Sequence, residues 1–321
     1  MKAAYLKLSS KEEKVLLNLS NLLLRQVQSH SDPNLQEVLT SLVDSLPYRL
    51  TSFLSDYKYS LSQSICIIDN LPFEKSESLE SPETHRSFLG DQKITLADAM
   101  HSIICRFFGF LVGFSYQQWG RLVNDIIPIE KDSFLEGAST SANVSFHLHT
   151  EESFLMHPPR FLCFSCIRNE EKAETLISTP SISDLDFAIQ EELSRSNFTI
   201  ATNSLQKKEL MSNEVLSIIF GFENELSLRF NMGRMYPIDK TSEALRAISK
   251  LEDLVNKEKK SLIFRRSCMY ILNNHRIAHG RRNYPTDFGS KKRWLLRSVV
   301  TTDLDLYDRY LDSSRPFVIN T

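Results

Sequence analysis

The residues best able to do chemistry lie close together in FHLHTEESFLMH, residues 146–157. The alternation of apolar and polar residues here is typical of a β-strand, in which residues two apart point to the same face. His149 and Glu151 therefore offer an imidazole and a carboxylate side by side, which are two ligands for a divalent metal ion. A single His-x-Glu pair is a weak signal, because polar residues at this spacing also occur on ordinary strands.

A third metal ligand is expected from YILNNHRIAHGRRNYP, residues 270–285, where a strand-like run ends in His275 and His279. Two histidines and one carboxylate that leave other positions open form the facial triad of non-haem Fe(II) oxygenases. Arg293 lies 14 residues after His279, and Arg297 follows four residues later. The residues between them are apolar, so this run is expected to be a buried strand. A buried arginine there can bind a carboxylate through two parallel hydrogen bonds.

Five pieces of the chain resemble, in the same order, the motifs of the clavaminate synthase-like Fe(II)/2-oxoglutarate oxygenases. That group includes clavaminate synthase and hydroxylases of asparagine, arginine and lysine. The resemblance runs from ICIIDNLP to TTDL, which is most of the chain. The matching pieces are GRLVNDIIP, HTEESF, FLCFSCIRN, NNHRIAHGRRNY and RWLLRSVVTTDL.

The resemblance implies an iron centre in which His149, Glu151 and His279 bind Fe(II). It also implies that 2-oxoglutarate and O₂ are cosubstrates, and that oxidation of 2-oxoglutarate to succinate and carbon dioxide drives oxidation of the substrate. Glu151 fills the position that a halogenase leaves open for chloride, so hydroxylation is favoured. Desaturation and ring closure stay open.

The resemblance assigns three further residues to carboxylates. Arg293 would bind the far carboxylate of 2-oxoglutarate, Thr175 in KAETLIS would assist there, and Arg297 would bind the carboxylate of the substrate. The implied function is hydroxylation of the β or γ carbon of a free L-amino acid in specialised metabolism. A basic side chain is expected from the habit of the family and from acidic residues in this half of the chain. These are Asp125, Glu152, Glu223, Glu225 and Asp239.

Other interpretations of these residues stay open. His147 shares a strand face with His149 and could replace it as a ligand, as in the HxH motif of cupins, although the carboxylate follows too closely and the cupin glycines are missing. Asn231, in LRFNM, stands where related enzymes often have an aspartate, and HPPRF stands where they more often have an Arg-Pro-Asp-aromatic run, which leaves the substrate contacts open. His157 and His275 are expected to be structural or to support the ligands.

Two alternative functions also fit the sequence. The first is a hydroxylase of a carrier-bound or peptidyl residue, which needs an open groove. The second is a catalytically silent jelly-roll protein that binds metal. Stoichiometric release of succinate separates an active oxygenase from the silent protein, and the sequence does not reveal the width of a groove.

The elements that must position these residues follow from the hydrophobic periodicity. Apolar residues three and four apart predict helices in the first part of the chain, with capping boxes at Ser10/Glu13 and Thr95/Asp98. From about residue 120 the period falls to two, which predicts strands. The predicted helices span residues 9–30, 35–56, 95–114, 183–196, 206–219 and 241–259. A loop is expected over residues 74–93. The predicted strands are QSICIIDNLP, RLVNDIIPI, VSFHLHTE, RFLCFSCIR, LSLRFNM, SCMYILNN and WLLRSVVTT.

The resemblance implies a mainly β fold with added helices. Its core is expected to be a double-stranded β-helix, or jelly roll, wrapped by N-terminal helices and carrying a helical insertion. We expect one oxygenase domain. Its expected boundaries are 1–321 for the whole domain, about 1–60 for the helical N-terminal part, about 61–180 and 220–305 for the core, and about 180–262 for the insertion.

The composition excludes several classes of protein. A net charge of −2 and a pI of about 6.5 give no basic footprint for nucleic acid, and the basic residues within 281–292 are expected to form a solvated loop. No signal peptide or run of roughly 20 apolar residues is present, so no membrane span is expected. The five cysteines are irregularly spaced, and the CxxC pair Cys163 and Cys166 lies in an apolar strand, which predicts free buried thiols and a cytoplasmic protein. The oligomeric state stays open.

Overall fold

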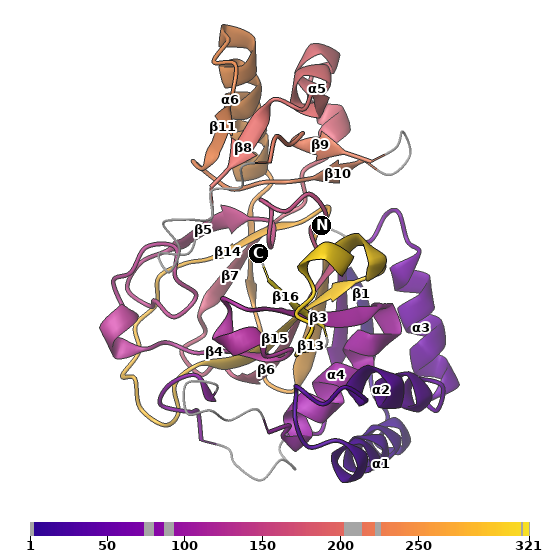
Figure 1. Ribbon diagram of the computed structural model, residues 1–321. Helices are drawn as coiled ribbons and strands as arrows, with labels where there is room; N and C mark the ends of the chain where they lie inside the picture. The colour runs from indigo at the N-terminus through magenta and orange to yellow at the C-terminus, as the bar shows by residue number, and fades with distance from the viewer. Residues whose placement is uncertain are drawn as a thin grey trace.

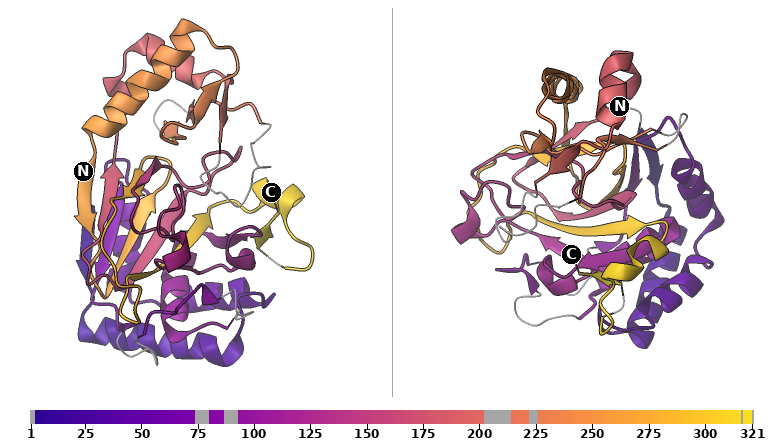
Figure 2. Two further views of the ribbon diagram at one scale, coloured as in Figure 1. Left: turned by 90° about the vertical axis from the view of Figure 1, so that its left-hand side faces the viewer. Right: turned by 45° about the horizontal axis from the view of Figure 1, so that its top comes forward.

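The computed structural model describes residues 3–73, 80–86, 93–201, 214–221, 226–315 and 317–320. Within this part of the chain, two β-sheets face each other across an apolar layer (Figure 1). Helices cover the outer side of the larger sheet, and a smaller helical layer lies beyond the other sheet (Figure 2). The fold is therefore mixed α/β. No helix among the described residues is both long and apolar enough to cross a membrane.

The larger sheet contains β1 (Ala3–Lys7), β2 (Ile65–Asp69), β3 (Phe110–Phe114), β4 (Asn124–Ile126), β6 (Phe161–Arg168), β13 (Cys268–Asn273), β15 (Trp294–Thr301) and β16 (Val318–Ile319). Its order is β1-β2-β13-β6-β15-β3-β16, and β4 also pairs with β15. The central strand β6 is buried along its whole length. Phe161 and Cys163 pack against the helices, while Leu162 and Phe164 face the apolar layer between the sheets. Burial on both faces explains why this strand has a continuous apolar sequence.

The smaller sheet contains β12 (Lys260–Ile263), β7 (Glu174–Ser178), β14 (Ala278–Arg281) and β5 (Phe146–His149), in that order. Within it, His279 of β14 stands directly opposite His149 of β5 on one side and Ile177 of β7 on the other. Directly paired residues share a face of a sheet. Because Ile177 packs into the apolar layer between the sheets, both histidines also face the larger sheet.

The helices on the outer side of the larger sheet are α1 (Ser10–Gln26), α2 (Leu35–Val43), α3 (Tyr48–Lys58) and α4 (Leu96–Phe108). The predicted capping box of Thr95 and Asp98 at the start of α4 is confirmed. The predicted box at the start of α1 is wrong by one residue, because Ser9 and Glu12 form it. These helices pack their apolar faces against β2, β6, β13 and β15 and form the largest part of the core.

A third layer covers the outer face of the smaller sheet. It consists of α5 (Phe187–Ser194), β8 (Phe198–Ile200), β9 (Ile219–Phe220), β10 (Ser227–Leu228), β11 (Met235–Pro237) and α6 (Ser242–Lys257). Leu251 and Val255 of α6 share a cluster with Leu148 of β5 and Ala278 of β14. Since Leu148 and Ala278 are the neighbours of the two inward histidines, this layer fixes the sheet face that carries them. The predicted helices over 183–196 and 241–259 are confirmed here as α5 and α6.

The predicted single helix over residues 35–56 is wrong, because the chain forms two helices, α2 and α3, with Pro47 between them. Proline lacks a backbone N–H, so it does not continue a helix but is well accommodated at the start of the next one. The leucine periodicity runs through both helices and therefore gives no sign of the break.

The predicted helix over residues 95–114 is also wrong in its second half. The helix α4 ends at Phe108, and strand β3 begins at Phe110. Gly109 makes the transition, because a Cβ atom at this position would lie 2.1 Å from the carbonyl oxygen of Thr301 in β15. Glycine alone lets the two backbones approach so closely. The chain thereby enters the sheet directly from the helix that covers it.

Other predicted elements fall partly outside the described residues. Of the predicted helix over 206–219, the first eight positions, 206–213, lie outside them, and the remainder leads into strand β9. The described part of the predicted loop over 74–93 includes residues 80–86, which are irregular. The sequence patterns missed the short strands β1, β7, β12 and β14.

Candidate metal centre and active-site cavity

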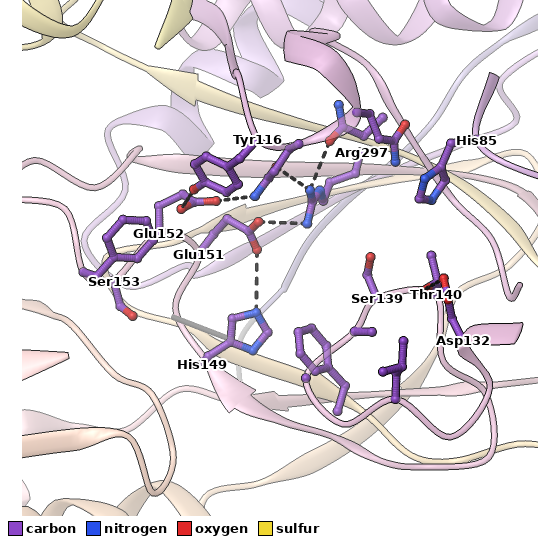
Figure 3. Close-up of a pocket in the computed structure, with 18 of the residues that line it drawn as sticks. His85, Tyr116, Asp132, Ser139, Thr140, His149, Glu151, Glu152, Ser153 and Arg297 are labelled. Atoms are coloured by element: carbon purple, nitrogen blue, oxygen red, sulfur yellow. Dashed lines mark hydrogen bonds and ion pairs between the residues drawn. The ribbon is translucent and has the colours of Figure 1, made fainter. Parts of the chain in front are cut away.

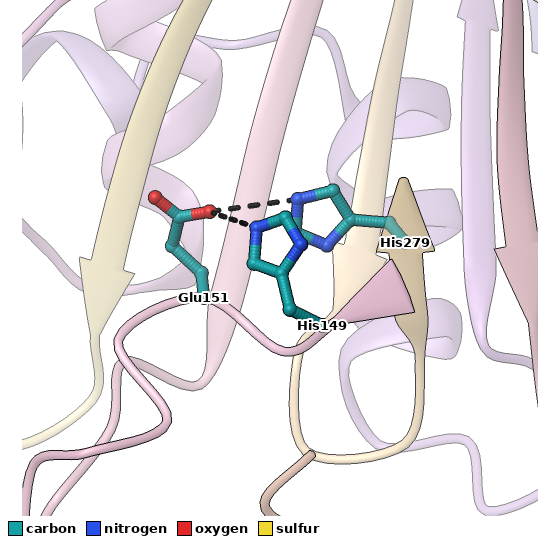
Figure 4. Close-up of side chains that lie close together, drawn as sticks. All are labelled: His149, Glu151 and His279. Carbon is teal, nitrogen blue, oxygen red and sulfur yellow. Dashed lines mark ion pairs between the residues drawn. The ribbon is translucent and has the colours of Figure 1, made fainter. Parts of the chain in front are cut away.

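The structure brings His149, Glu151 and His279 into one buried cluster (Figure 4). The two histidines come from paired strands, and Glu151 lies in the turn directly after β5. Nε2 of His279 is 3.5 Å from Oε2 of Glu151, and Nε2 of His149 is 3.7 Å from the same oxygen. All three ligand atoms lie within 4.8 Å of one another. This is the group of residues that the sequence singled out.

The protonation states in this cluster suit a metal ion. Nδ1 of His149 is 2.9 Å from the carbonyl oxygen of His147, so it donates there and leaves Nε2 free to bind. Burial lowers the pKa of His279 to about 4, which keeps this imidazole neutral. Burial acts to raise the pKa of Glu151, but Arg297 and both histidines outweigh it and hold that pKa well below its usual range.

The donor set of this cluster fits an iron ion. Oε2 of Glu151 is buried and accepts no hydrogen bond from any described residue. A buried carboxylate oxygen that faces two imidazoles without a hydrogen bond is costly unless a cation lies between them. Two nitrogen donors and one oxygen donor on one side of the ion are the ligands of non-haem Fe(II) sites, with the other positions open.

A cavity of about 490 Å³ lies in front of the cluster (Figure 3). His149 at the end of β5 and Glu151 in the turn after it form one wall, and the segment that follows β3 forms another. A third wall comes from residues 131–140, which include Asp132 and Thr140, and His85 reaches the cavity from a separate segment. Phe146, Phe154 and Leu135 contribute apolar surface. The cavity is therefore a mixed polar and apolar site of a size that accommodates small molecules.

Arg297 faces this cavity and contacts Glu151 of the candidate metal centre directly. Its Nη1 donates to Oε1 of Glu151 at 2.8 Å. Its Nη2 donates to Oε1 of Gln117 at 2.7 Å and to Oδ1 of Asn124 at 3.1 Å. Three acceptors from three different segments thus fix the position of the guanidinium. The sequence predicted that Arg297 faces the interior but not its contact with Glu151.

Arg293 and Thr175 lie at a second, smaller cavity of about 40 Å³, which His279 also lines. Arg293, Leu295 and Arg297 line it together, as residues two apart on one strand face should. Arg293 is 4% exposed, and its Nε and Nη1 have no hydrogen-bond partner among the described residues. The hydroxyl of Thr175 is likewise buried and unpartnered there.

These unpartnered groups have a chemical meaning. A buried guanidinium with two unused donors is costly, unless an anion binds it. The small cavity adjoins the large one, because Ser139, Phe146 and Arg297 line both. A molecule bound at Arg293 would lie beside His279, which lines the small cavity as well. The fit to a dicarboxylate cosubstrate rests on this observation.

Three other histidines that the sequence raised do not join the metal cluster. The side chain of His147 is exposed, because the strand pairing shifts register between His279 and Arg281. His157 is also exposed, and its carbonyl oxygen accepts a bond from a tyrosine hydroxyl. His275 lies 3.0 Å from the carbonyl oxygen of Pro158 through its Nε2. The backbone of His147 contributes to the site, since it fixes the ring of His149.

The acidic residues cited for a basic substrate have different locations. Glu152 lines the large cavity. Asp125 lies on β4 and forms a buried ion pair with Arg86, and Asp239 is exposed. Glu223 and Glu225 lie outside the described residues. Among the five, Glu152 therefore keeps the support of a position at the site.

The interpretation of residues 281–292 as a solvated loop is wrong at two positions. Arg281 is buried and donates to the carbonyl oxygens of Ser139 and Val144. Lys292 is buried and donates to the carbonyl oxygen of Glu83 at 2.9 Å. These cations hold the cavity loop and the segment at 80–86 in place. The five cysteines, by contrast, are free and buried, as predicted.

The sequence reasoning missed Tyr116, Gln117 and Asn124 as cavity residues. Asn124 lies within GRLVNDIIP, one of the matched motifs, so a signal for it was present. Tyr116 and Gln117 lie in an irregular segment after β3, where no periodicity shows which way a side chain points. Gln118 and Trp119, which follow, have φ angles of 44° and 60°.

No family model matches the chain. Individual known proteins do resemble it. The chain is 22% identical to the enduracididine beta-hydroxylase of Streptomyces hygroscopicus, over 81% of this chain and 83% of that one. It is 23% identical to the L-ornithine/L-arginine 3-hydroxylase of Catenulispora acidiphila, over 81% and 82% of the two chains. It is also 23% identical to clavaminate synthase 2 of Streptomyces clavuligerus, over 82% of each.

Solved structures extend the similarity to the whole fold. The non-heme iron oxygenase OrfP, in complex with Fe and alpha-ketoglutaric acid, superposes with a TM-score of 0.89 at 20% identity, over 99% of this chain and 100% of that one. An asparagine oxygenase with Fe(II), 3-hydroxyasparagine and succinate superposes with a TM-score of 0.87 at 17% identity, over 99% of both. The predicted resemblance is confirmed: in sequence and in fold, this chain is similar to the clavaminate synthase-like Fe(II)/2-oxoglutarate oxygenases.

Proposed function

We propose that the protein is an Fe(II)- and 2-oxoglutarate-dependent dioxygenase that hydroxylates the β or γ carbon of a free L-amino acid. The observation that carries the proposal is the buried cluster of His149, Glu151 and His279 at the wall of a cavity. The similarity of this chain to amino-acid hydroxylases, over most of its length, supports the same activity. The two facing sheets are proposed to be a double-stranded β-helix within a single domain that spans residues 1–321.

His149, Glu151 and His279 are the proposed ligands of Fe(II), which would activate O₂ while 2-oxoglutarate is oxidised to succinate and carbon dioxide. The protein's part is to hold two imidazoles and one ionised carboxylate on the same side of the ion. Burial keeps the imidazole of His279 neutral, the bond from Nδ1 of His149 to the carbonyl oxygen of His147 leaves Nε2 of His149 free to bind, and Arg297 keeps Glu151 ionised. The cavity walls keep water away from the reacting carbon and hold the substrate in one orientation.

Arg293 is the proposed partner of the far carboxylate of 2-oxoglutarate, with Thr175 beside it. The support is the set of buried donors that no described residue satisfies, Nε and Nη1 of Arg293 and Oγ1 of Thr175. A guanidinium presents its N–H groups as a planar fork that matches the two oxygens of a carboxylate. Lys292, the residue before Arg293, instead donates to the backbone carbonyl oxygen of Glu83.

Arg297 is the proposed partner of the α-carboxylate of the amino acid. A guanidinium has five N–H groups, and the three hydrogen bonds to described residues leave two for a ligand. Oε1 of Glu151 accepts one of the three, and it has a second lone pair that could accept from the substrate ammonium. The α-carbon would then lie near the metal, with Cβ and Cγ nearest to the site of oxidation.

A basic side chain such as that of arginine or lysine is the proposed substrate class, within specialised metabolism. The named activities of the related hydroxylases on ornithine and arginine support this choice, and Glu152 supplies a carboxylate at the cavity wall. Asn231 also lines the cavity, so the wall there carries an amide. The free buried thiols suit a reducing, cytoplasmic location. No nucleic-acid or membrane partner is proposed.

The test is a screen of the twenty amino acids with Fe(II), 2-oxoglutarate and O₂, in which mass spectrometry detects a gain of one oxygen and succinate is measured in parallel. Hydroxylated product and succinate should form in equal amounts with at least one free amino acid. A matched His279→Ala variant should form neither.

Two outcomes would contradict the proposal. Product formed only from a carrier-bound or peptidyl residue would support the alternative hydroxylase. Binding of Fe(II) without succinate release from any amino acid, carrier-bound residue or peptide would support a silent metal-binding protein.

A further inference from the structure

Glu152 follows a proposed metal ligand directly in the chain but takes no part in the metal cluster. Its φ angle is 53°, a left-handed conformation that few residues other than glycine adopt. The turn directs its side chain away from the cluster, toward the segment after β3 (Figure 3). There its carboxylate accepts hydrogen bonds from the hydroxyl of Tyr116 and from Nε2 of Gln117. It is 7% exposed.

The amide of Gln117 connects this carboxylate to Arg297. Its Oε1 accepts from Nη2 of Arg297 at 2.7 Å, while its Nε2 donates to Oε1 of Glu152. An arginine can only donate, so the oxygen of the amide must face it. The amide nitrogen then faces the opposite way and requires an acceptor. Glu152 supplies that acceptor, so Arg297 and Glu152 together determine which way round the amide lies.

We propose that Glu152 is a positioning residue that orients the amide of Gln117 and through it holds Arg297 in place for the carboxylate of the amino acid. The inference rests on the proposed function, since it concerns the same substrate site. Without an acceptor at position 152, the amide can rotate and present N–H to the N–H groups of Arg297. The guanidinium then loses one of its three acceptors and relaxes toward Glu151 or Asn124. Arg293 lines the smaller cavity, to which Glu152 and Gln117 do not contribute, so it is expected to keep its position.

The geometry predicts which replacement preserves the role. In Glu152→Gln, the new amide can place its oxygen toward Gln117 and its nitrogen toward the hydroxyl of Tyr116, which can accept as well as donate. In Glu152→Ala, Nε2 of Gln117 and the hydroxyl of Tyr116 both lose this acceptor. Glu152→Leu also removes the acceptor but keeps most of the side-chain volume. The comparison of alanine with leucine therefore separates lost packing from lost hydrogen bonding.

The kinetic test uses the amino acid that the wild-type enzyme turns over fastest among the twenty. Glu152→Ala and Glu152→Leu should both raise the KM for this amino acid about tenfold, which corresponds to one lost hydrogen bond. The KM for 2-oxoglutarate should change less than about twofold, and Glu152→Gln should recover most of the affinity. Glu192→Ala, which removes a buried glutamate of α5 that pairs with Arg195, is the matched control.

A double-mutant cycle tests whether Glu152 acts through Gln117. The variant that combines Glu152→Ala with Gln117→Ala should have the same KM as Gln117→Ala alone, because the intermediate has already been removed. Additive effects would overturn the inference, as would a Glu152→Gln variant as impaired as Glu152→Ala. Equal increases in both KM values would point to general structural damage and would overturn it too.

A crystal structure of Glu152→Leu gives a readout that does not depend on activity. The oxygen of Gln117 should no longer lie within hydrogen-bond distance of Nη2 of Arg297. If that contact persists, the inference is wrong even where the kinetics change. If the wild type hydroxylates none of the twenty amino acids, the proposed substrate has failed, and the structure still decides whether Glu152 orients the amide.

Discussion

Nη1 of Arg297 lies 2.8 Å from Oε1 of Glu151, so the arginine proposed for the substrate carboxylate is bonded to a proposed metal ligand. Arg297 lies on β15 of the larger sheet and Glu151 in the turn after β5 of the smaller sheet, so their contact joins the proposed substrate site to the proposed metal site. A buried carboxylate and a buried guanidinium are each costly without an opposite charge, so each of these two groups stabilises the charged form of the other. Substrate binding and metal binding are therefore expected to affect each other.

The first prediction concerns the metal ligands. His149→Ala, Glu151→Ala and His279→Ala should each abolish turnover, and His279→Ala should also weaken binding of Fe(II), measured anaerobically by calorimetry. His147→Ala is the control, because it removes an exposed histidine two residues away and keeps the backbone carbonyl that orients His149. If His147→Ala loses the iron while His149→Ala retains it, the ligand assignment is wrong.

The second prediction concerns 2-oxoglutarate. Arg293→Ala should raise the KM for this cosubstrate by roughly ten- to a hundredfold, since a hydrogen bond to a charged group contributes about 1.5–3 kcal/mol. Arg293→Lys should recover little, because an ammonium group lacks the planar fork. The KM for the amino acid should stay close to the wild-type value. A KM for 2-oxoglutarate that does not change would exclude the proposed role of Arg293.

The site residues differ in how far the sequence could predict them. The period of two pointed to His149 and Glu151 as neighbours, although β5 ends at His149 and Glu151 lies in the turn that follows. The same period pointed to Arg293 and Arg297, of which Arg297 lies on β15 and Arg293 directly before it. The bond between Arg297 and Glu151 was not predictable, because it depends on the distance between two sheets, which no pattern within a single strand reports.

The residues around Arg297 were harder still to predict. Gln117 lies beside two residues with positive φ angles, Gln118 and Trp119, and Glu152 has one itself. Residues other than glycine rarely adopt this conformation, so propensity rules give no warning of it. The same limit applied to the fold, where Gly109 converts the end of a helix into the start of a strand within an unbroken apolar run.

The third prediction concerns stability against pH. His101 of α4 is fully buried, and burial lowers its pKa to about 3, while Nδ1 lies 2.8 Å from the hydroxyl of Ser165. In the unfolded chain this pKa is about 6.5, so protonation favours unfolding. The contribution of His101 is complete above about pH 6.5 and is lost as the pH falls toward 3. Between these pH values, the free energy of unfolding should fall by on the order of 1 kcal/mol for each unit that the pH decreases.

Urea unfolding at a series of pH values measures this contribution. His101→Asn can keep the hydrogen bond to Ser165 without a group that titrates, and it should reduce the slope between about pH 6 and pH 4. His157→Asn, which removes an exposed histidine, is the control for the change in charge. Equal slopes for the wild type and His101→Asn would contradict the prediction.

The last prediction returns to Arg297 and the carboxylate of the substrate. If Arg297 binds that carboxylate, then the methyl ester of the preferred amino acid should be a poor substrate, because the ester carries no charge to pair with the guanidinium. The N-acetyl form separately removes the ammonium proposed to bind at Glu151. Arg297→Lys should raise the KM for the free acid about tenfold or more and narrow the difference between acid and ester, since one lysine cannot bond to Glu151, Gln117 and a ligand in the same geometry. The measurement is the turnover number and the KM for the acid and for the ester, each with the wild type and with Arg297→Lys. Equal activity of the wild type on acid and ester would refute the role of Arg297 and, with it, the free amino acid as substrate.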